Sequence, residues 1–198
     1  MPGSWSYWRG ATATEYAYWA GDAAPLLATH FHGEHQLTLI LTGSRRFEVA
    51  GRAVHVGTGE CLLIPAGTPH RSLPHVHQGT RCLNLYIPAP RARRSLVAGF
   101  DPIARIAARH AASREGFTRK FARQFGMPPH AYRLVGRLNE VRVRLRDGDS
   151  VAGVAAELGF ADQSHLGRHF RRLFGVSPRA YRDGTLVTNV PDVPARTS

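Results

Sequence analysis

The chain of 198 residues is poor in lysine, cysteine and long apolar stretches. Only one of its 26 basic residues is a lysine, Lys120, a bias that carries no functional information. The two cysteines, Cys61 and Cys82, lie in apolar runs without a CxxC motif. They predict reduced core thiols of a cytosolic protein, although a disulfide stays open. No apolar stretch suits a signal peptide or a membrane span, which predicts a cytoplasmic protein without a membrane partner.

Positive charge is scarce in the first half of the chain and concentrates in the second half. Residues 1–90 hold six arginines and five acidic residues, a net charge of +1, whereas residues 91–182 hold 19 basic and seven acidic residues, a net charge of +12. The step near residue 90 predicts a domain boundary. A basic half with an apolar framework favours a polyanion partner, most often a nucleic acid, over a surface that is basic only for solubility.

A segment of sixteen residues occurs twice. Residues 118–133 return 49 positions later as residues 167–182, and nine of the sixteen positions are identical. A repeat this close implies two copies of one small unit. Each copy combines a basic amphipathic helix, a glycine that ends it and a proline that opens the next helix. Two such helices suit the recognition of two stretches of DNA groove.

The first half of the chain shows an antiparallel β pattern. Short runs rich in β-branched and aromatic residues alternate with turns that contain glycine or proline. Runs of this length and spacing are typical of a sandwich or barrel. The expected strands are residues 36–41, 45–49, 52–56, 60–64 and 81–87.

Spaced histidines in the same region resemble the two motifs of the cupin superfamily. The first motif, G-x5-HxH-x3,4-E-x6-G, is matched by His30, His32, Gln36 and Gly43, and the second, G-x5-PxG-x2-H-x3-N, by Gly59, Pro65, Gly67 and His70. The first motif lacks its opening glycine and has Gln36 in place of glutamate, and Pro74 replaces the final asparagine of the second. In cupins the corresponding side chains point into a β-barrel and hold a divalent metal.

Two kinds of site remain open for these residues. His30 and His32 share a face if they lie on one strand, and His70 would complete a three-imidazole site for Zn, Ni, Cu or Fe, with Gln36 as a weak fourth ligand. The favoured alternative is a metal-free pocket in which His30, His32, Gln36 and His70 bind an organic effector. As a third alternative, these residues have purely structural roles and form no site. Other histidines are close enough to replace one of the ligands: His35, His75 and His77.

The first helical unit is expected between residues 101 and 126. Asp101 followed by Pro102 is a typical helix start. Ser113 is expected to cap a second helix that Gly126 ends. Phenylalanine recurs every four residues in this helix, which predicts a buried stripe. Its members are Phe117, Phe121 and Phe125.

A long central helix and a second unit follow. The central helix is expected from Pro129 to about Arg146, with one buried face formed by Leu134, Leu138, Val141 and Leu145. In the second unit a supporting helix begins near Val151. Asp162 or Ala161 begins the next helix, whose buried stripe consists of Leu166, Phe170, Leu173 and Phe174.

Residues 148–182 resemble the characteristic pattern of the AraC/XylS family of bacterial transcription regulators, G-x-S/T-I-x-x-V-A-x-x-x-G-F-x-D/S-x-S-x-F/L-x-R-x-F-K/R-x-x-x-G-x-S/T-P-x-x-Y-R, almost without departure. Residues 103–133 match the less regular first helix-turn-helix of the same domain. The resemblance implies an α+β two-domain protein. A cupin-like ligand-sensing β-barrel (residues 1–90) precedes an all-α domain (91–184) with two helix-turn-helix units joined by a long helix, and residues 185–198 form a disordered tail.

The resemblance implies a sequence-specific DNA-binding transcription regulator and not an enzyme. Its partners would be the major groove of double-stranded promoter DNA, a small-molecule effector and RNA polymerase. Two helices, residues 113–125 and 162–173, would enter groove segments about 34 Å apart. Arg119 and Arg168 suit guanine and Gln163 suits adenine. The residues expected to contact DNA are Arg114, Glu115, Thr118, Arg119, Gln163, Ser164, His165, Gly167, Arg168 and Arg171.

Two other functions remain as alternatives: a metal-dependent cupin enzyme fused to a nucleic-acid-binding domain, and a constitutive DNA binder with a vestigial barrel. One departure from the family concerns assembly. Only about ten residues separate the last expected strand from Asp101, too few for the helices that dimerise many relatives. The sequence therefore predicts a monomer on DNA.

Overall fold

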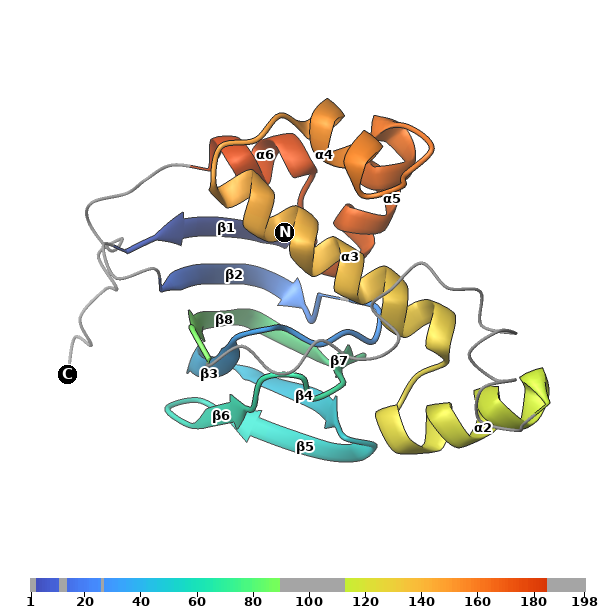
Figure 1. The fold of residues 1–198 in the computed structure, drawn as a ribbon. Helices are drawn as coiled ribbons and strands as arrows, with labels where there is room; N and C mark the ends of the chain where they lie inside the picture. The colour runs from blue at the N-terminus through green and yellow to red at the C-terminus, as the bar shows by residue number, and fades with distance from the viewer. Residues whose placement is uncertain (1–2, 11–13, 26, 90–112, 185–198) are drawn as a thin grey trace.

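The computed structural model describes residues 3–10, 14–25, 27–89 and 113–184 (Figure 1). The expected helix start at Asp101 and the tail at residues 185–198 lie outside these ranges. Within them, every helix is too short or too polar to span a lipid bilayer.

The first part of the chain forms two facing antiparallel sheets. The order of the five-stranded sheet is β1 (Ser4–Arg9), β2 (Glu15–Ala23), β8 (Val76–Ile87), β3 (His35–Thr42) and β6 (Cys61–Ile64). The order of the three-stranded sheet is β5 (Arg52–Gly57), β4 (Ser44–Val49) and β7 (His70–Leu73). All five expected strands are confirmed, in an open sandwich rather than a closed barrel within the described residues.

Strands β1, β2 and β7 were not expected. In β2, burial alternates along the strand: Glu15, Ala17 and Trp19 are buried, and Tyr16 and Tyr18 are half-buried on the other face. This period of two marks a strand with one face on the core. The cue was present in the sequence, since large aromatic and small residues alternate there.

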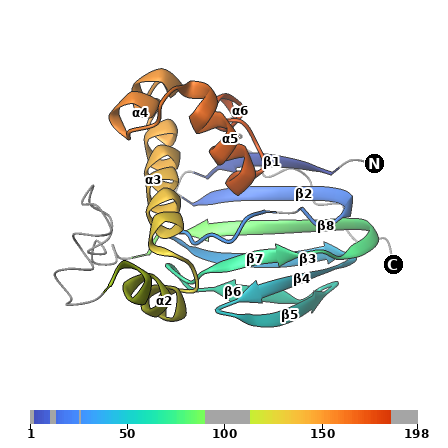
Figure 2. The same cartoon turned by 90° about the vertical axis from the view of Figure 1, so that its right-hand side faces the viewer.

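The helical part consists of α2 (Arg114–Phe125), α3 (Pro129–Arg146), α4 (Val151–Glu157), α5 (Gln163–Phe174) and α6 (Pro178–Asp183). Helix α3 runs along the β-sandwich, with α2 at one end and the α4–α6 group at the other (Figure 2). The long central helix between α2 and the second helical unit is therefore confirmed.

The sequence repeat is also a repeat of helix ends. The caps Ser113 and Asp162, 49 positions apart, each accept a hydrogen bond from the backbone N–H three residues on, at 3.0 and 2.6 Å. Gly126 and Gly175, also 49 apart, end α2 and α5 in the left-handed conformation with φ of 69° and 76°. Glycine reaches this conformation without strain, so it ends both helices at the same point.

The predicted buried stripe of α5 is confirmed, because all four of its members are buried. In α3, Leu138, Val141 and Leu145 are buried, but Leu134 is only half-buried and the adjacent Val135 takes its place. In α2 the prediction is wrong in part.

Only Phe121 of the three α2 phenylalanines is buried, while Phe117 and Phe125 are half-buried. Helix α2 lies at the far end of α3, away from the α4–α6 group. The rings of Phe121 and Phe125 pack on Tyr132 of α3, with centroids 5.5 and 5.6 Å from its ring.

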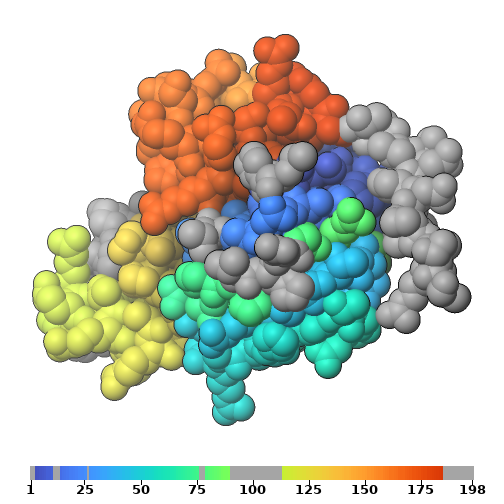
Figure 3. Space-filling model, turned by 180° about the vertical axis from the view of Figure 1, so that it is seen from behind, coloured from blue at the N-terminus to red at the C-terminus, as the bar shows by residue number. Residues whose placement is uncertain are grey.

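The sandwich and the helices pack directly on each other. Phe31 belongs to the same apolar cluster as the cores of α3 and α5. The Asn139 side chain donates to the carbonyl of Phe31 at 2.8 Å, and the Tyr7 hydroxyl donates to the carbonyl of Phe174 at 2.7 Å. In the space-filling view the red C-terminal helices lie against the blue first strands (Figure 3). The sandwich and the second helical unit therefore share one continuous packed interface.

Candidate functional site

A basic groove lies on the exposed side of α5, opposite its buried stripe. Its walls come from α5 and from the N-terminal ends of α4 and α6. Of the residues expected to contact DNA, five line it: Gln163, Ser164, Gly167, Arg168 and Arg171. None of the described residues that line it is acidic.

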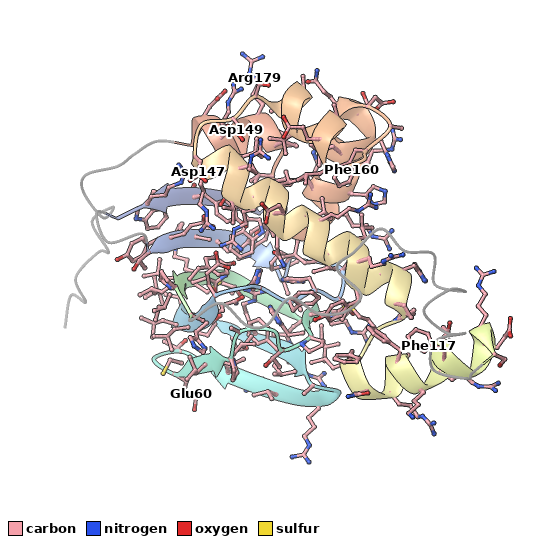
Figure 4. The ribbon with its side chains drawn as sticks, viewed as in Figure 1. Glu60, Phe117, Asp147, Asp149, Phe160 and Arg179 are labelled. Carbon is pink, nitrogen blue, oxygen red and sulfur yellow. The ribbon has the colours of Figure 1, made fainter. Side chains whose placement is uncertain are left out.

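Four guanidinium groups give the groove its charge: those of Arg168, Arg171, Arg179 and Arg182. Arg179 and Arg182 pair with Asp183, at 3.4 and 2.8 Å. Arg179 stands at the outer edge of the molecule, away from the sandwich (Figure 4). Arg168 and Arg171 are exposed and form no ion pair with a described residue, so their donors are available to a ligand.

His165 differs from its neighbours on α5. Its Nδ1 accepts from the backbone N–H of Ala161 at 3.3 Å, and its Nε2 lies 3.1 Å from Nε2 of His169. Both ring nitrogens thus have partners within the protein, which makes His165 a weaker candidate for base recognition than Gln163 or Ser164.

The remaining predicted DNA contacts lie on α2. Arg114, Glu115 and Arg119 are exposed, and Thr118 is half-buried. The Thr118 hydroxyl donates to the Arg114 carbonyl at 2.8 Å, so it is already engaged within the helix. The two predicted recognition helices thus present polar faces from opposite ends of α3.

A second candidate site lies inside the sandwich, where His30, His32 and His70 come together as predicted. They are 5%, 3% and 3% exposed, and one nitrogen of each ring lies within 4.8 Å of one nitrogen of each of the others. His30 is not on a regular strand but forms an isolated bridge to His70. The one-strand geometry expected for His30 and His32 is therefore wrong, although their proximity is right.

The other predicted members of this site fall in different places. Gln36 is buried, and its Nε2 donates to Thr38 Oγ1 at 2.9 Å, while its Oε1 has no partner. His35 accepts from the backbone of Ala66, and His75 bonds to Ser44. Neither belongs to the cluster, and the side chain of His77 lies outside the described part.

Hydrogen bonds fix the protons on the three rings. His30 Nδ1 lies 2.6 Å from the Ala28 carbonyl, and His70 Nδ1 lies 2.9 Å from the Thr68 carbonyl. A carbonyl only accepts, so these Nδ1 atoms carry protons and each neutral ring keeps its lone pair on Nε2. His32 Nδ1 lies 3.2 Å from Nη1 of Arg142. A guanidinium only donates, so His32 has the opposite tautomer, with its proton on Nε2.

All three imidazoles are neutral near pH 7. Burial lowers the pKa of His30 and His32 well below the usual range, and neighbouring histidines lower it further. Burial also lowers the pKa of His70 to about 4. The cluster therefore offers polar atoms but no charge of its own.

The arrangement fits a divalent metal poorly. A metal needs the lone pair of each ligating nitrogen, and His32 presents an Nε2–H instead while it accepts from Arg142. Gln36 supplies no negative charge where a cupin has glutamate. The guanidinium groups of Arg45 and Arg142 also act on these rings electrostatically, which disfavours a further cation.

An ion-pair network between β2 and α3 was not among the features predicted from the sequence. Arg142 is 1% exposed, and its Nε and Nη2 lie 3.1 and 2.9 Å from Oε1 of Glu15, which is also 1% exposed. The Tyr181 hydroxyl donates to the other Glu15 oxygen, and Glu34 lies 3.6 Å from Arg142. Burial opposes the charge of Arg142, but Glu15 and Glu34 outweigh it and hold the pKa of Arg142 well above its ordinary value.

One cue to this network was visible. Arg142 follows Leu138 by four residues and precedes Leu145 by three, so it falls on the predicted buried face of the central helix. A charged residue at such a position requires a partner. The sequence pattern did not indicate that the partner is Glu15, 127 positions earlier.

Known family models match both the β-sandwich and the helical part of the chain. A family model described as an AraC-like ligand binding domain matches residues 13–120, slightly over half of the chain, and one described as a helix-turn-helix domain matches residues 106–184. The chain belongs to the AraC family. The predicted combination of an AraC-like ligand-binding domain and a helix-turn-helix domain is thereby confirmed.

Curated relatives match part of this AraC-family chain. The regulator MtrA of Neisseria gonorrhoeae is 39% identical over 71 residues, 35% of this chain and 24% of MtrA. The activator RhaS of Escherichia fergusonii is 41% identical over 80 residues, 40% of this chain and 29% of RhaS. The regulator Rv1931c of Mycobacterium tuberculosis is 34% identical over 104 residues, 52% of this chain and 40% of Rv1931c.

The matched segment thus spans less than half the length of each of these relatives. Among solved structures, a cupin superfamily protein from Desulfitobacterium hafniense aligns with 44% of this chain and 78% of its own, at 11% identity and a TM-score of 0.39.

Proposed function

We propose that this AraC-family protein binds promoter DNA sequence-specifically through α2 and α5 and responds to a small effector held in the sandwich. The observation that carries the proposal is the groove on α5. It combines exposed hydrogen-bonding side chains with guanidinium groups and has no acidic lining residue among those described. That composition suits DNA, because guanidinium groups bind its phosphates and polar side chains form hydrogen bonds with the edges of its bases.

Each residue of the two helices that was predicted to contact DNA has a role in this proposal. Arg168 and its repeat counterpart Arg119 read guanine, and Gln163 reads adenine. Arg171 contacts phosphates together with three further exposed arginines: Arg114, Arg123 and Arg172. The remaining predicted contacts support these from the same faces: Glu115, Thr118, Ser164, His165 and Gly167.

Replacement of Arg168 by alanine should weaken binding to a specific duplex by about 5- to 150-fold, the effect of losing about 1–3 kcal/mol of base discrimination. Binding to a scrambled duplex should change much less. Gel-shift titrations on both duplexes measure the two effects. Arg52→Ala, which removes an exposed arginine from β5, serves as the control. Equal weakening on both duplexes would make Arg168 a phosphate contact instead.

One chain should occupy one bipartite site, because α2 and α5 belong to the same polypeptide and lie at opposite ends of α3. We expect half-elements about 10–10.5 bp apart on a non-palindromic site. Affinity should fall steeply with salt, because the basic helical part displaces counterions from the phosphates. Light scattering of the complex on a short duplex gives the stoichiometry, and two chains per minimal site would contradict the prediction.

His30, His32, Gln36 and His70 form the proposed effector site. Several of their polar atoms are buried without partners, and each such atom costs about 1–3 kcal/mol. A vestigial barrel would have no reason to keep them, so a functional pocket is favoured over a constitutive DNA binder.

A regulatory role is also favoured over catalysis. Metal-dependent cupin enzymes usually use the carboxylate that Gln36 replaces. The relatives carry the names of regulators and activators. We further propose RNA polymerase as a partner on the promoter and the cytoplasm as the location.

A further inference from the structure

Arg45 is a buried cation for which the described part of the chain supplies no carboxylate partner. It lies on β4 inside the sandwich and is 2% exposed. Its Nη1 donates to Cys82 Sγ at 3.2 Å and its Nη2 to Ser72 Oγ at 2.9 Å. Its Nε has no partner. Among the described residues no carboxylate pairs with it. Its Cζ lies over the ring of Phe47, 4.5 Å from the ring centroid, which gives a cation–π contact.

Arg142, the other buried arginine described above, has carboxylate partners that balance its charge. Arg142 has Glu15 at 2.9 Å and Glu34 at 3.6 Å. Arg45 has no such carboxylate among the described residues, so in this part of the protein its positive charge is not balanced. Arginine does not lose its proton at any pH that a cell reaches. Burial of an unpaired ion is costly, so the charge calls for an anion.

The unpaired guanidinium belongs to the same interior as the histidine cluster. Ser72, which binds Arg45, lies two residues beyond His70 on β7 and therefore on the same face of that strand. The charge of Arg45 also acts on His30 and His70. Four buried polar atoms in this interior have no hydrogen-bond partner within 3.5 Å among the described residues: Arg45 Nε, His32 Nε2, His70 Nε2 and Gln36 Oε1. The Gln36 side chain also acts on His32, whose pKa it raises.

We propose that the sandwich binds a small organic carboxylate that also carries a hydroxyl group, with Arg45 as its anion-binding residue. The inference rests on the effector site proposed above and names the chemical class of its ligand. Arg45 and His32 supply N–H donors for the carboxylate. His70 Nε2 and the Gln36 amide oxygen accept from the hydroxyl. The same donors and charges repel a divalent cation.

Thermal unfolding of the full chain with four probes tests the ligand class: lactate, propionate, lactamide and Zn²⁺, at one ionic strength. Propionate lacks the hydroxyl and lactamide lacks the charge. Saturating lactate should raise the melting temperature by about 5–10 °C. Propionate should raise it less, and lactamide and Zn²⁺ should leave it unchanged. Stabilisation by Zn²⁺ or by lactamide but not by lactate overturns the proposal.

The variant Arg45→Met separates ligand binding from a structural role. Methionine fills a similar volume without charge, so the ligand-free variant should melt at a higher temperature than the parent and should lose the lactate response. Arg46→Met, at the exposed neighbouring position on β4, should change neither. A full lactate response in Arg45→Met, or a lower melting temperature without ligand, overturns the role of Arg45. Gel-shift binding of Arg45→Met to DNA is scored separately, so failure of this inference is distinguishable from failure of the proposed DNA recognition.

Discussion

Replacement of Glu15 by glutamine is expected to lower the free energy of unfolding by about 3–5 kcal/mol, because it leaves the buried charge of Arg142 without its main partner. The glutamine keeps the shape of the side chain, so the loss reports on charge rather than packing. Glu34 alone, at 3.6 Å from Arg142, is too distant to replace the lost contact. Urea unfolding followed by circular dichroism measures the effect.

The protein contains a matched control for this experiment. Glu48 and Arg71 form an ion pair at the same 2.9 Å separation, but their side chains are 33% and 46% exposed. Glu48→Gln should therefore cost no more than about 1 kcal/mol. The double variant Glu15→Gln with Arg142→Met should recover much of the stability. Equal losses for Glu15→Gln and Glu48→Gln would show that the buried pair is not a stability determinant.

Replacement of Phe170 by alanine should have an effect of similar size, about 3–5 kcal/mol. The Phe170 side chain is fully buried in the centre of the second helical unit. Its ring lies 4.5 Å from that of Phe174 and 5.4 Å from that of Tyr181, measured between centroids. Loss of the ring should loosen α5 and abolish DNA binding indirectly. Thermal melts and gel shifts on the same preparation test both effects.

Val143→Ala is the control for Phe170→Ala, because Val143 is 37% exposed on α3. It should change the melting curve little. An unchanged curve for Phe170→Ala would mean that the ring is not packed as described and that α5 is rotated about its axis.

Local features of the helical part were predictable from the sequence. The caps Ser113 and Asp162, the terminating Gly126 and Gly175, and the buried stripe of α5 each depend on residues within four positions of one another. Such spacings are determined by the helix itself, so a sequence pattern reports them directly. The proximity of His30, His32 and His70 followed from resemblance to a family, not from spacing alone.

Contacts between distant segments were not predictable in the same way. Glu15 and Arg142 are 127 positions apart. Arg45 on β4 donates hydrogen bonds to Ser72 on β7 and to Cys82 on β8. Periodicity shows that a position faces the core, but not which side chain meets it there. The tautomer of His32 is a further example, because the proton position depends on Arg142.

The buried pair of Glu15 and Arg142 limits how this protein is recombined with its relatives. One partner comes from the second strand of the sensor and the other from the central helix of the DNA-binding part. A chimera that joins residues 113–184 to a foreign sensor would bury Arg142 against an unmatched surface. Any working exchange must therefore bring a carboxylate to the position of Glu15, or replace Arg142 with an apolar residue at the same time.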